Sequence, residues 1–163
     1  MKSRLTICVF FAAVTCITAV ALATAPRFEI AGTEAQSAVV DHATTLMWQQ
    51  QSTLDAPVTW AAALAHCEGL VYAGFEDWRL PAINELLSLV DEKKTELPAV
   101  NTTFFVNFPA TPNPGFWTST THRRQASQAY VVYFGEPNTV VGRGGTTGQN
   151  KAFEGNVLCV RDL

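Results

Sequence analysis

The residues most suited to ligand chemistry form a basic turn between two segments rich in β-formers, 116–120 and 129–134. Arginine side chains in such a turn can make two parallel hydrogen bonds to a carboxylate or sulfate group. In an acidic chain, a local basic cluster is where an anionic ligand would be attracted. A turn that is simply solvated explains the same charges equally well. The residues assigned to this candidate site are His122, Arg123, Arg124, Tyr130 and Arg143, with Tyr133 as an alternative to Tyr130.

The tripeptide Glu136-Pro137-Asn138 offers a second kind of chemistry. The same tripeptide supplies two calcium ligands and binds sugar hydroxyls in calcium-dependent sugar-binding lectins, and oxygen ligands of this kind suit Ca²⁺. Those lectins add a Trp-Asn-Asp triplet downstream, which this chain lacks. We interpret the tripeptide as a turn between two strands. Glu136 and Asn138 are therefore weak metal candidates, and no cofactor is expected, calcium being the ion that these two residues would suit.

No pattern associated with catalysis occurs in complete form. The glycine-rich segment 142–148 lacks the lysine of a phosphate-binding loop, and no helix is predicted after it. Ser119 and Ser127 lack the flanking glycines of a nucleophile elbow. Asp41 and His42 are adjacent, but a turn capped by the aspartate side chain explains Asp41 without any reaction. We therefore assign no catalytic residue and expect a protein that is not an enzyme.

The N-terminal segment has the composition of a secretory signal peptide. Lys2 and Arg4 precede an apolar run that ends in small residues, and we place cleavage after Ala25. An uncleaved membrane anchor is the main alternative, because about 20 apolar residues can span a bilayer. A lipoprotein modified at Cys16 is a weaker alternative. The expected organisation is a signal peptide at 1–25 and a single domain at 26–163.

Cleavage at this position would remove two of the eleven basic residues and none of the fourteen acidic ones. The nine remaining basic residues against fourteen acidic ones give a net charge of −5. This balance disfavours nucleic acid as a partner. We expect an exported protein, periplasmic or secreted, with no membrane association after cleavage. The sequence does not indicate an oligomeric state.

Cys67 and Cys159 are the two cysteines outside the predicted signal peptide. In an exported protein two such cysteines are expected to form a disulfide. Closing a loop of this size is worth about 4 kcal/mol in the chain-entropy model. Two buried free thiols are the alternative. A zinc site is disfavoured, since tetrahedral zinc requires four clustered ligands.

The segment 77–91 predicts a strand that leads into a helix. Trp78 and Leu80 alternate around Arg79 with the period of a strand, and the following proline, Pro81, favours a helix start. The spacing of the apolar residues after it places them on one helix face, directed at the core, and turns Asn84, Glu85, Ser88 and Asp91 toward water. The apolar residues of this predicted face are Ile83, Leu86, Leu87 and Val90.

The other predicted elements surround this segment. A hairpin is predicted over 39–49, with Asp41 capping its turn, and Phe28 and Ile30 fit a sheet edge before it. A helix over 60–70 begins after Thr59 as N-cap and directs Cys67 inward. Aromatic residues fold the long loop 97–115 over the core. Strands are predicted at 116–120, 129–134, 139–141 and 156–161, with a glycine-rich loop at 142–150. The fold class is α+β, with two helices packed on a small antiparallel sheet and long ordered loops.

Several of these motifs, taken in order, resemble the Lcl C-terminal domain family, which is named after a domain of a bacterial collagen-like adhesin. The resemblance covers residues 39–161. The motifs that carry it are Leu46-Met47-Trp48-Gln49, the helix with Trp60, Ala63 and Cys67, Trp78-Arg79-Leu80-Pro81 with Asn84-Glu85-Leu86, the segments 116–120 and 130–135, and Leu158-Cys159-Val160-Arg161.

The resemblance implies an architecture similar to C-type lectin-like domains, in which a helix cysteine bonds to a cysteine of the last strand. It also implies a binding role, because the adhesin's domain binds sulfated polysaccharides at the cell surface. This chain differs in being acidic and in having no collagen-like stalk. We therefore expect an exported, non-enzymatic binding module for glycans or another envelope ligand in adhesion.

Two other functions remain as alternatives. The first is a structural or assembly component of the cell envelope. The second is an enzyme of the formylglycine-generating type, since the same broad fold hosts such enzymes. Those enzymes need an active-site cysteine pair in addition to a structural bridge, and two cysteines cannot serve both roles.

Overall fold

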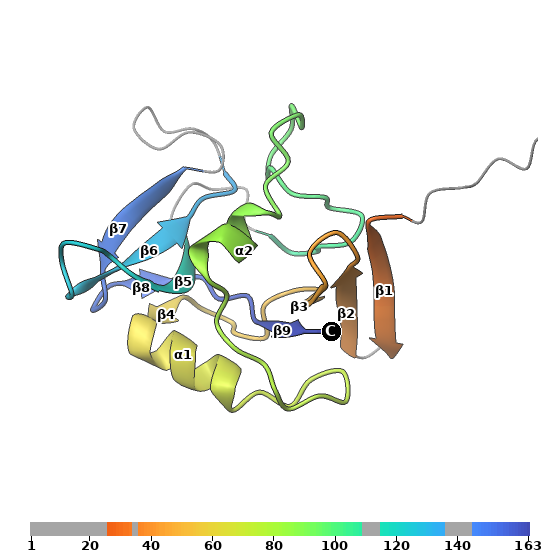
Figure 1. Cartoon of the computed structure of the whole chain (residues 1–163), viewed down its shortest axis with the longest axis horizontal. Helices are drawn as coiled ribbons and strands as arrows, with labels where there is room; N and C mark the ends of the chain where they lie inside the picture. The colour runs from red at the N-terminus through yellow and green to blue at the C-terminus, as the bar shows by residue number, and fades with distance from the viewer. Residues whose placement is uncertain (1–25, 34–35, 109–114, 136–144) are drawn as a thin grey trace, which may run out of the picture.

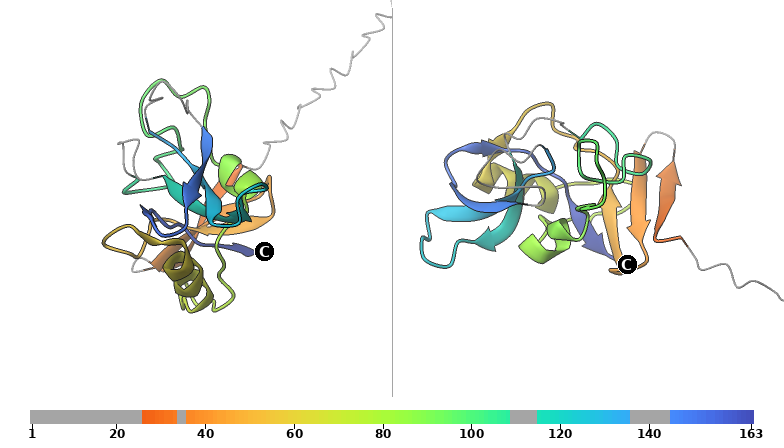
Figure 2. Two further views of the ribbon diagram at one scale, coloured as in Figure 1. Left: turned by 90° about the vertical axis from the view of Figure 1, so that its left-hand side faces the viewer. Right: turned by 90° about the horizontal axis from the view of Figure 1, so that it is seen from above.

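The computed structural model describes residues 26–33, 36–108, 115–135 and 145–163. The predicted signal peptide 1–25 and the predicted strand at 139–141 lie outside the described residues. The candidate site residues Glu136, Asn138 and Arg143 lie outside them as well. A four-stranded sheet lies at one end of the long axis and a three-stranded sheet at the other, with helix α2 between them (Figures 1 and 2). The described part of the chain contains no helix that is long and apolar enough to cross a membrane.

The four-stranded sheet is antiparallel and has the order β1-β2-β3-β9. Its strands are β1 Phe28–Thr33, β2 Gln36–Asp41, β3 Leu46–Gln49 and β9 Val160–Asp162. Side chains on both faces of β2 and β3 are buried: Val39 and Trp48 pack into one core cluster, and Ala38 and Met47 into a second. A strand buried on both faces has a continuous apolar sequence rather than an alternating one. The predicted hairpin over 39–49 and the edge position of Phe28 and Ile30 are confirmed.

The second sheet contains β5 Phe116–Thr121, β6 Gln128–Val132 and β7 Thr146–Asn150, in that order. A short pair, β4 Val58–Thr59 and β8 Glu154–Gly155, lies beside it. The prediction of a glycine-rich loop at 142–150 was wrong for the residues of β7, which form a strand. A polar segment can pair with a neighbouring strand through its backbone alone. Gly148 is part of the reason for this pairing: a Cβ at this position would lie 2.6 Å from Gln128 Oε1.

Helix α1, Trp60–Glu68, is shorter than the predicted 60–70, because Gly69 leaves helical geometry and the N–H of Leu70 bonds to the carbonyl of Cys67, three residues back instead of four. Thr59 takes the N-cap position, but its side chain makes no capping hydrogen bond. Helix α2, Ile83–Leu87, ends before the predicted Asp91. Leu89 is buried although it lies outside the predicted apolar face.

The core role of the strand-to-helix segment is confirmed. Trp78 and Leu80 are each 2% exposed and Leu86 is fully buried, while Ile83 and Leu87 are half-buried against the same core. The predicted strand is reduced to one backbone bridge, in which Arg79 and Val160 exchange hydrogen bonds of 2.8 and 2.9 Å.

Glu85 does not point to water as predicted. Its carboxylate accepts two hydrogen bonds from Arg79, both 2.8 Å, and one from the N–H of Ala82, 2.7 Å. Arg79 also pairs with Asp162 at 2.8 Å. Burial would raise the pKa of Glu85, but the hydrogen bonds from Arg79 and Ala82 outweigh it and hold this pKa below its ordinary value. The ion pair fixes the start of α2 to the last strand.

The predicted disulfide is present. Cys67 of α1 and Cys159, directly before β9, are bonded with their Cα atoms 5.5 Å apart, and both are fully buried. Gln49, also fully buried, accepts the N–H of Cys159 at 2.8 Å. The aromatic packing of the loop after residue 97 is confirmed where the structure describes it, since Phe105 packs edge-on against Phe28 and Phe108 stacks on Phe116. The part of the chain that the structure describes therefore has an α+β fold, with two helices and several small antiparallel sheets.

Candidate functional site

The predicted basic turn forms the tip of the β5–β6 hairpin. The N–H of His122 bonds to Gln128 O at 2.8 Å, and the N–H of Gln128 bonds to Gln125 O at 2.9 Å, which closes the turn. Arg123 and Arg124 lie at its exposed end. The described ion pairs of the protein include neither arginine. Both guanidinium groups therefore face solvent without a carboxylate partner among the described residues.

His122 and Tyr130 lie side by side at the base of the tip. Their ring centroids are 5.0 Å apart, and both residues are half-buried. Gly148 of β7 lies under the imidazole, since a Cβ there would be 2.8 Å from His122 Cδ2. Tyr133, the alternative to Tyr130, lies at the other end of the sheet, where its ring packs close to Gly115. The structure thus brings four predicted site residues together and separates Tyr133 from them.

Two further residues complete this surface, and sequence reasoning missed both roles. The backbone N–H of Lys151 bonds to Ser127 O, and its Nζ donates to Thr121 Oγ1, both at 2.9 Å. The same Nζ lies 3.9 Å from the centroid of the Trp60 ring. The indole N–H of Trp60 bonds to Thr118 O at 2.9 Å, which attaches the start of α1 to β5. The pairing of β7 with β6 creates this arrangement, and no local sequence signal indicates it.

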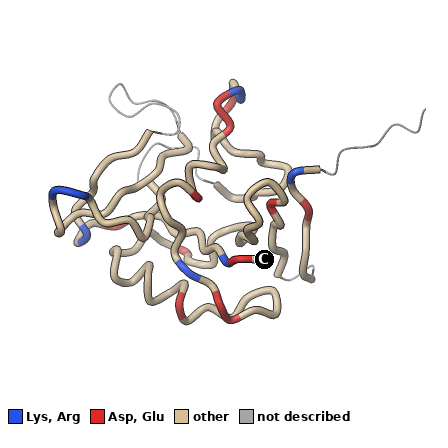
Figure 3. Tube along the Cα trace, viewed as in Figure 1, with Lys and Arg blue, Asp and Glu red and all other residues tan. Residues whose placement is uncertain are grey.

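We call this surface the basic face, consisting of Trp60, His122, Arg123, Arg124, Tyr130 and Lys151. Figure 3 shows the basic hairpin tip and the basic turn after β7 near each other at the outer end of the three-stranded sheet. The acidic residue of the adjoining strand β8 is Glu154, which is exposed and pairs through its backbone with Thr59. The basic face combines three cationic groups with aromatic rings, which is a suitable surface for an anionic ligand that has apolar faces.

Asp41 and His42, the adjacent acid and base of the sequence, each bond to partners that stabilise the fold. Asp41 is fully buried, caps the hairpin turn by accepting the N–H of Ala43 at 3.0 Å, and pairs with Arg27 at 2.7 Å. Burial would raise the pKa of Asp41, but the hydrogen bonds from Arg27, Thr44 and the N–H of Ala43 together outweigh this effect, and the net pKa lies below its ordinary value. His42 bonds instead to Glu29 at 3.0 Å. Among the described residues, no group of three or more His, Cys, Asp or Glu side chains is placed to hold a metal ion.

The sequence profile of the Lcl C-terminal domain matches residues 37–161. The chain belongs to the Lcl C-terminal domain family. The match spans β2 to β9 and includes both cysteines of the disulfide. No curated protein matches the chain. In this Lcl C-terminal domain, β1 precedes the matched range yet pairs along its whole length with β2, so the sheet extends beyond the part that the family profile covers.

Proposed function

We propose that this Lcl C-terminal domain is an exported, non-enzymatic module that binds an anionic glycan, or another anionic surface ligand, through the basic face. The observation that carries the proposal is the placement of Arg123, Arg124 and Lys151 at one end of the molecule, without a carboxylate partner among the described residues. The chain as a whole is acidic. The basic face would attract an anionic polymer to this end of the molecule. The net negative charge of the chain would repel the polymer from the rest of the surface.

The chemistry of the basic face suits a sulfated or carboxylated sugar. Arginine binds such groups with a planar pair of hydrogen bonds. The half-buried rings of Trp60 and Tyr130 offer apolar area against which the C–H face of a sugar can pack. His122 is fixed between Tyr130 and β7, so little side-chain entropy is lost when a ligand contacts it.

The disulfide supports two further parts of the proposal. A disulfide of this kind is typical of proteins in oxidising compartments, which supports export to the periplasm or the exterior. It joins α1 to the residue before the last strand, as in the C-type lectin-like architecture that we propose for this domain. Because the bond occupies both Cys67 and Cys159, neither sulfur is available as an active-site thiol, which supports a binding role over an enzyme of the formylglycine-generating type.

The proposal is tested by a glycan array followed by titration with heparin oligosaccharides and dextran sulfate. We expect binding that weakens as salt rises, since exposed charges are screened beyond about 8 Å at physiological ionic strength. Arg123→Ala with Arg124→Ala should weaken binding at least about tenfold. Arg124→Lys keeps the charge and should recover part of the affinity of Arg124→Ala if the guanidinium fork matters.

A matched control is Lys93→Ala, which removes one positive charge from the exposed run after α2. It should have little effect compared with Arg124→Ala. Full affinity in the double variant Arg123→Ala, Arg124→Ala would contradict the assignment to the basic face. Equal losses of affinity in Lys93→Ala and Arg124→Ala would contradict it as well.

A further inference from the structure

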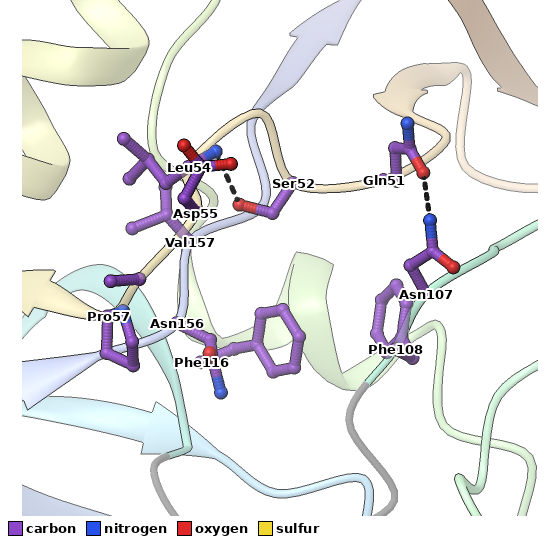
Figure 4. Close-up of a pocket in the computed structure, with 11 residues that line it drawn as sticks. Gln51, Ser52, Leu54, Asp55, Pro57, Asn107, Phe108, Phe116, Asn156 and Val157 are labelled. Atoms are coloured by element: carbon purple, nitrogen blue, oxygen red, sulfur yellow. Dashed lines mark hydrogen bonds between the residues drawn. The ribbon is translucent and has the colours of Figure 1, made fainter.

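A cleft of about 410 Å³ lies at the opposite end of β5 from the basic face. Phe116, the first residue of β5, lines it, whereas Thr121, the last, contacts Lys151. The two residues are five steps apart along the strand, roughly 17 Å at about 3.3 Å per step. Figure 4 shows the cleft between the loop 51–57 on one side and Asn107 and Phe108 on the other. It is therefore a site separate from the basic face.

The walls of the cleft are tied to each other and to the core. The amide of Asn107 donates a hydrogen bond to the amide oxygen of Gln51 across the two loops (Figure 4), and the N–H of Val106 bonds to Gln50 O at 3.1 Å. Thr53, in the same loop, bonds through Oγ1 to Gln49 at 3.3 Å and to His66 at 3.0 Å. Because these hydrogen bonds already hold the two loops in place, little conformational entropy is lost when a ligand binds in the cleft.

The floor of the cleft is rigid and contains two stacked aromatic rings. The ring of Phe116 is 4% exposed and stacks on Phe108, with the centroids 4.8 Å apart and the rings inclined at 21°. Asn156 is held at both backbone groups: its N–H bonds to Gly115 O and its carbonyl accepts the N–H of Trp117, both at 2.9 Å. The floor is therefore fixed, and its accessible aromatic area comes from the half-buried Phe108, because Phe116 is almost fully covered.

The rim of the cleft carries polar groups with hydrogen-bonding capacity to spare. Asp55 is exposed, and the ion pairs of the described residues do not include it. Ser52 Oγ accepts the N–H of Leu54 at 3.2 Å, which leaves its hydroxyl hydrogen for another acceptor. Gln51 and Asn107 share one hydrogen bond, in which the Asn107 nitrogen donates to the Gln51 oxygen, so the Gln51 nitrogen and the Asn107 oxygen keep hydrogen-bonding capacity.

Among the described residues, those that line the cleft include no lysine, arginine or histidine, and their one charge is the carboxylate of Asp55. An anionic ligand would be repelled here. A neutral sugar ring, in contrast, presents hydroxyl donors for the carboxylate, hydroxyl donors and acceptors for the amides, and a C–H face for the aromatic floor. The volume lies at the lower end of the range of about 300–1,000 Å³ for small-molecule sites, which suits one or two rings.

We propose that this cleft is a second binding site, and that its ligand is a neutral saccharide unit of one or two rings. Asp55, Gln51 and Asn107 bind the hydroxyl groups, and the half-buried ring of Phe108, which stacks on Phe116, supports the apolar face of the sugar ring. The site does not rest on the function proposed for the basic face, because no residue is shared between the two.

The test is a titration of the oxidised protein with cellobiose, maltose, lactose and N,N′-diacetylchitobiose, followed by ¹H–¹⁵N NMR. We expect saturable shifts of the side-chain amide signals of Gln51 and Asn107 with at least one of these sugars, at millimolar affinity. Added salt should leave this affinity unchanged. Asp55→Asn, which keeps the size of an exposed side chain, should weaken binding about tenfold because a charged acceptor is lost. Gln51→Ala should weaken it as well.

The control is the Arg123→Ala, Arg124→Ala variant, which should bind the neutral sugar with unchanged affinity. The proposal is overturned if none of the four sugars shifts the cleft signals at about 50 mM, well above a millimolar dissociation constant. It is also overturned if the shifts survive undiminished in both Asp55→Asn and Gln51→Ala. Failure of heparin binding at the basic face would leave these cleft signals unaffected, so the two proposals fail separately.

Discussion

The ammonium group of Lys151 lies 3.9 Å from the centroid of the Trp60 ring, so a residue of the turn after β7 covers the first residue of α1. The two residues are far apart in the sequence, and the contact joins the three-stranded sheet to the helix that carries Cys67. A cation over an indole ring contributes about 0.5–1 kcal/mol at an exposed site. Because the contact involves an indole ring, the fluorescence of Trp60 reports on the basic face.

Replacing Lys151 by methionine should change the fluorescence of Trp60. Trp48, Trp78 and Trp117 are each no more than 2% exposed, whereas Trp60 is half-buried, so acrylamide quenching reports mainly on Trp60. We expect Lys151→Met to alter the emission and the quenching, and saturating heparin to protect Trp60 in the wild type. Lys93→Met is the control for loss of a charge elsewhere. Identical spectra and quenching for wild type and Lys151→Met would contradict the contact.

The disulfide should contribute strongly to stability. Cys67 and Cys159 are 92 residues apart in the sequence, and closing such a loop is worth about 4.6 kcal/mol in the chain-entropy model. Chemical denaturation of a chain beginning at residue 26 should show a loss of this order when both cysteines become alanine. Thiol titration of the unreduced, unfolded chain should detect no free thiol. Two titratable thiols per chain would show that the bond does not form.

Features that depend on local sequence were predictable. The hairpin at 39–49 follows from two apolar runs around a polar turn, and the inward direction of Cys67 follows from helical spacing. The core positions of Trp78, Leu80 and Leu86 follow from strand and helix periodicity. The disulfide follows from there being two cysteines outside the predicted signal peptide.

Features that depend on contacts between distant segments were not predictable. The polar strand β7 has no apolar pattern to reveal it, and without β7 the position of Lys151 on the basic face cannot be inferred. The buried pair of Arg27 with Asp41 and the pair of Arg79 with Glu85 both require knowledge of which segments pack together. The cleft likewise forms between the loop 51–57 and Asn107, which meet because the four-stranded sheet and the aromatic cluster position them.

Leu86→Ala should be strongly destabilising. The side chain is fully buried in the core cluster that includes Phe105 and Phe116. Its truncation removes apolar burial and leaves a cavity, at a cost of about 2–5 kcal/mol. Leu163→Ala is the matched control, because this leucine is 56% exposed and should cost no more than about 0.5 kcal/mol. A melting temperature of Leu86→Ala equal to that of the control would show that α2 does not pack as described.

Acid should destabilise the protein through Asp41 and Glu85. Each carboxyl group has a pKa below its ordinary value, because its hydrogen bonds to arginine and to backbone N–H groups outweigh the effect of burial. The folded protein therefore binds fewer protons than the unfolded chain in this range. The resulting stability is fully present above the ordinary carboxyl pKa values and is lost as pH falls through the lowered folded values, which begins below about pH 4.5.

The contribution of Asp41 can be isolated by measuring the free energy of unfolding against pH in variants. Asp41→Asn removes the titrating group and should flatten the acid slope while lowering stability at neutral pH, since Arg27 loses its carboxylate. Arg27→Gln leaves the buried carboxylate of Asp41 without its guanidinium, which should cost about 1–3 kcal/mol at neutral pH. Glu92→Gln makes the same charge change as Asp41→Asn in the exposed run after α2 and serves as the comparison. An acid slope in Asp41→Asn as steep as that of the Glu92→Gln protein would show that Asp41 does not contribute to the acid sensitivity.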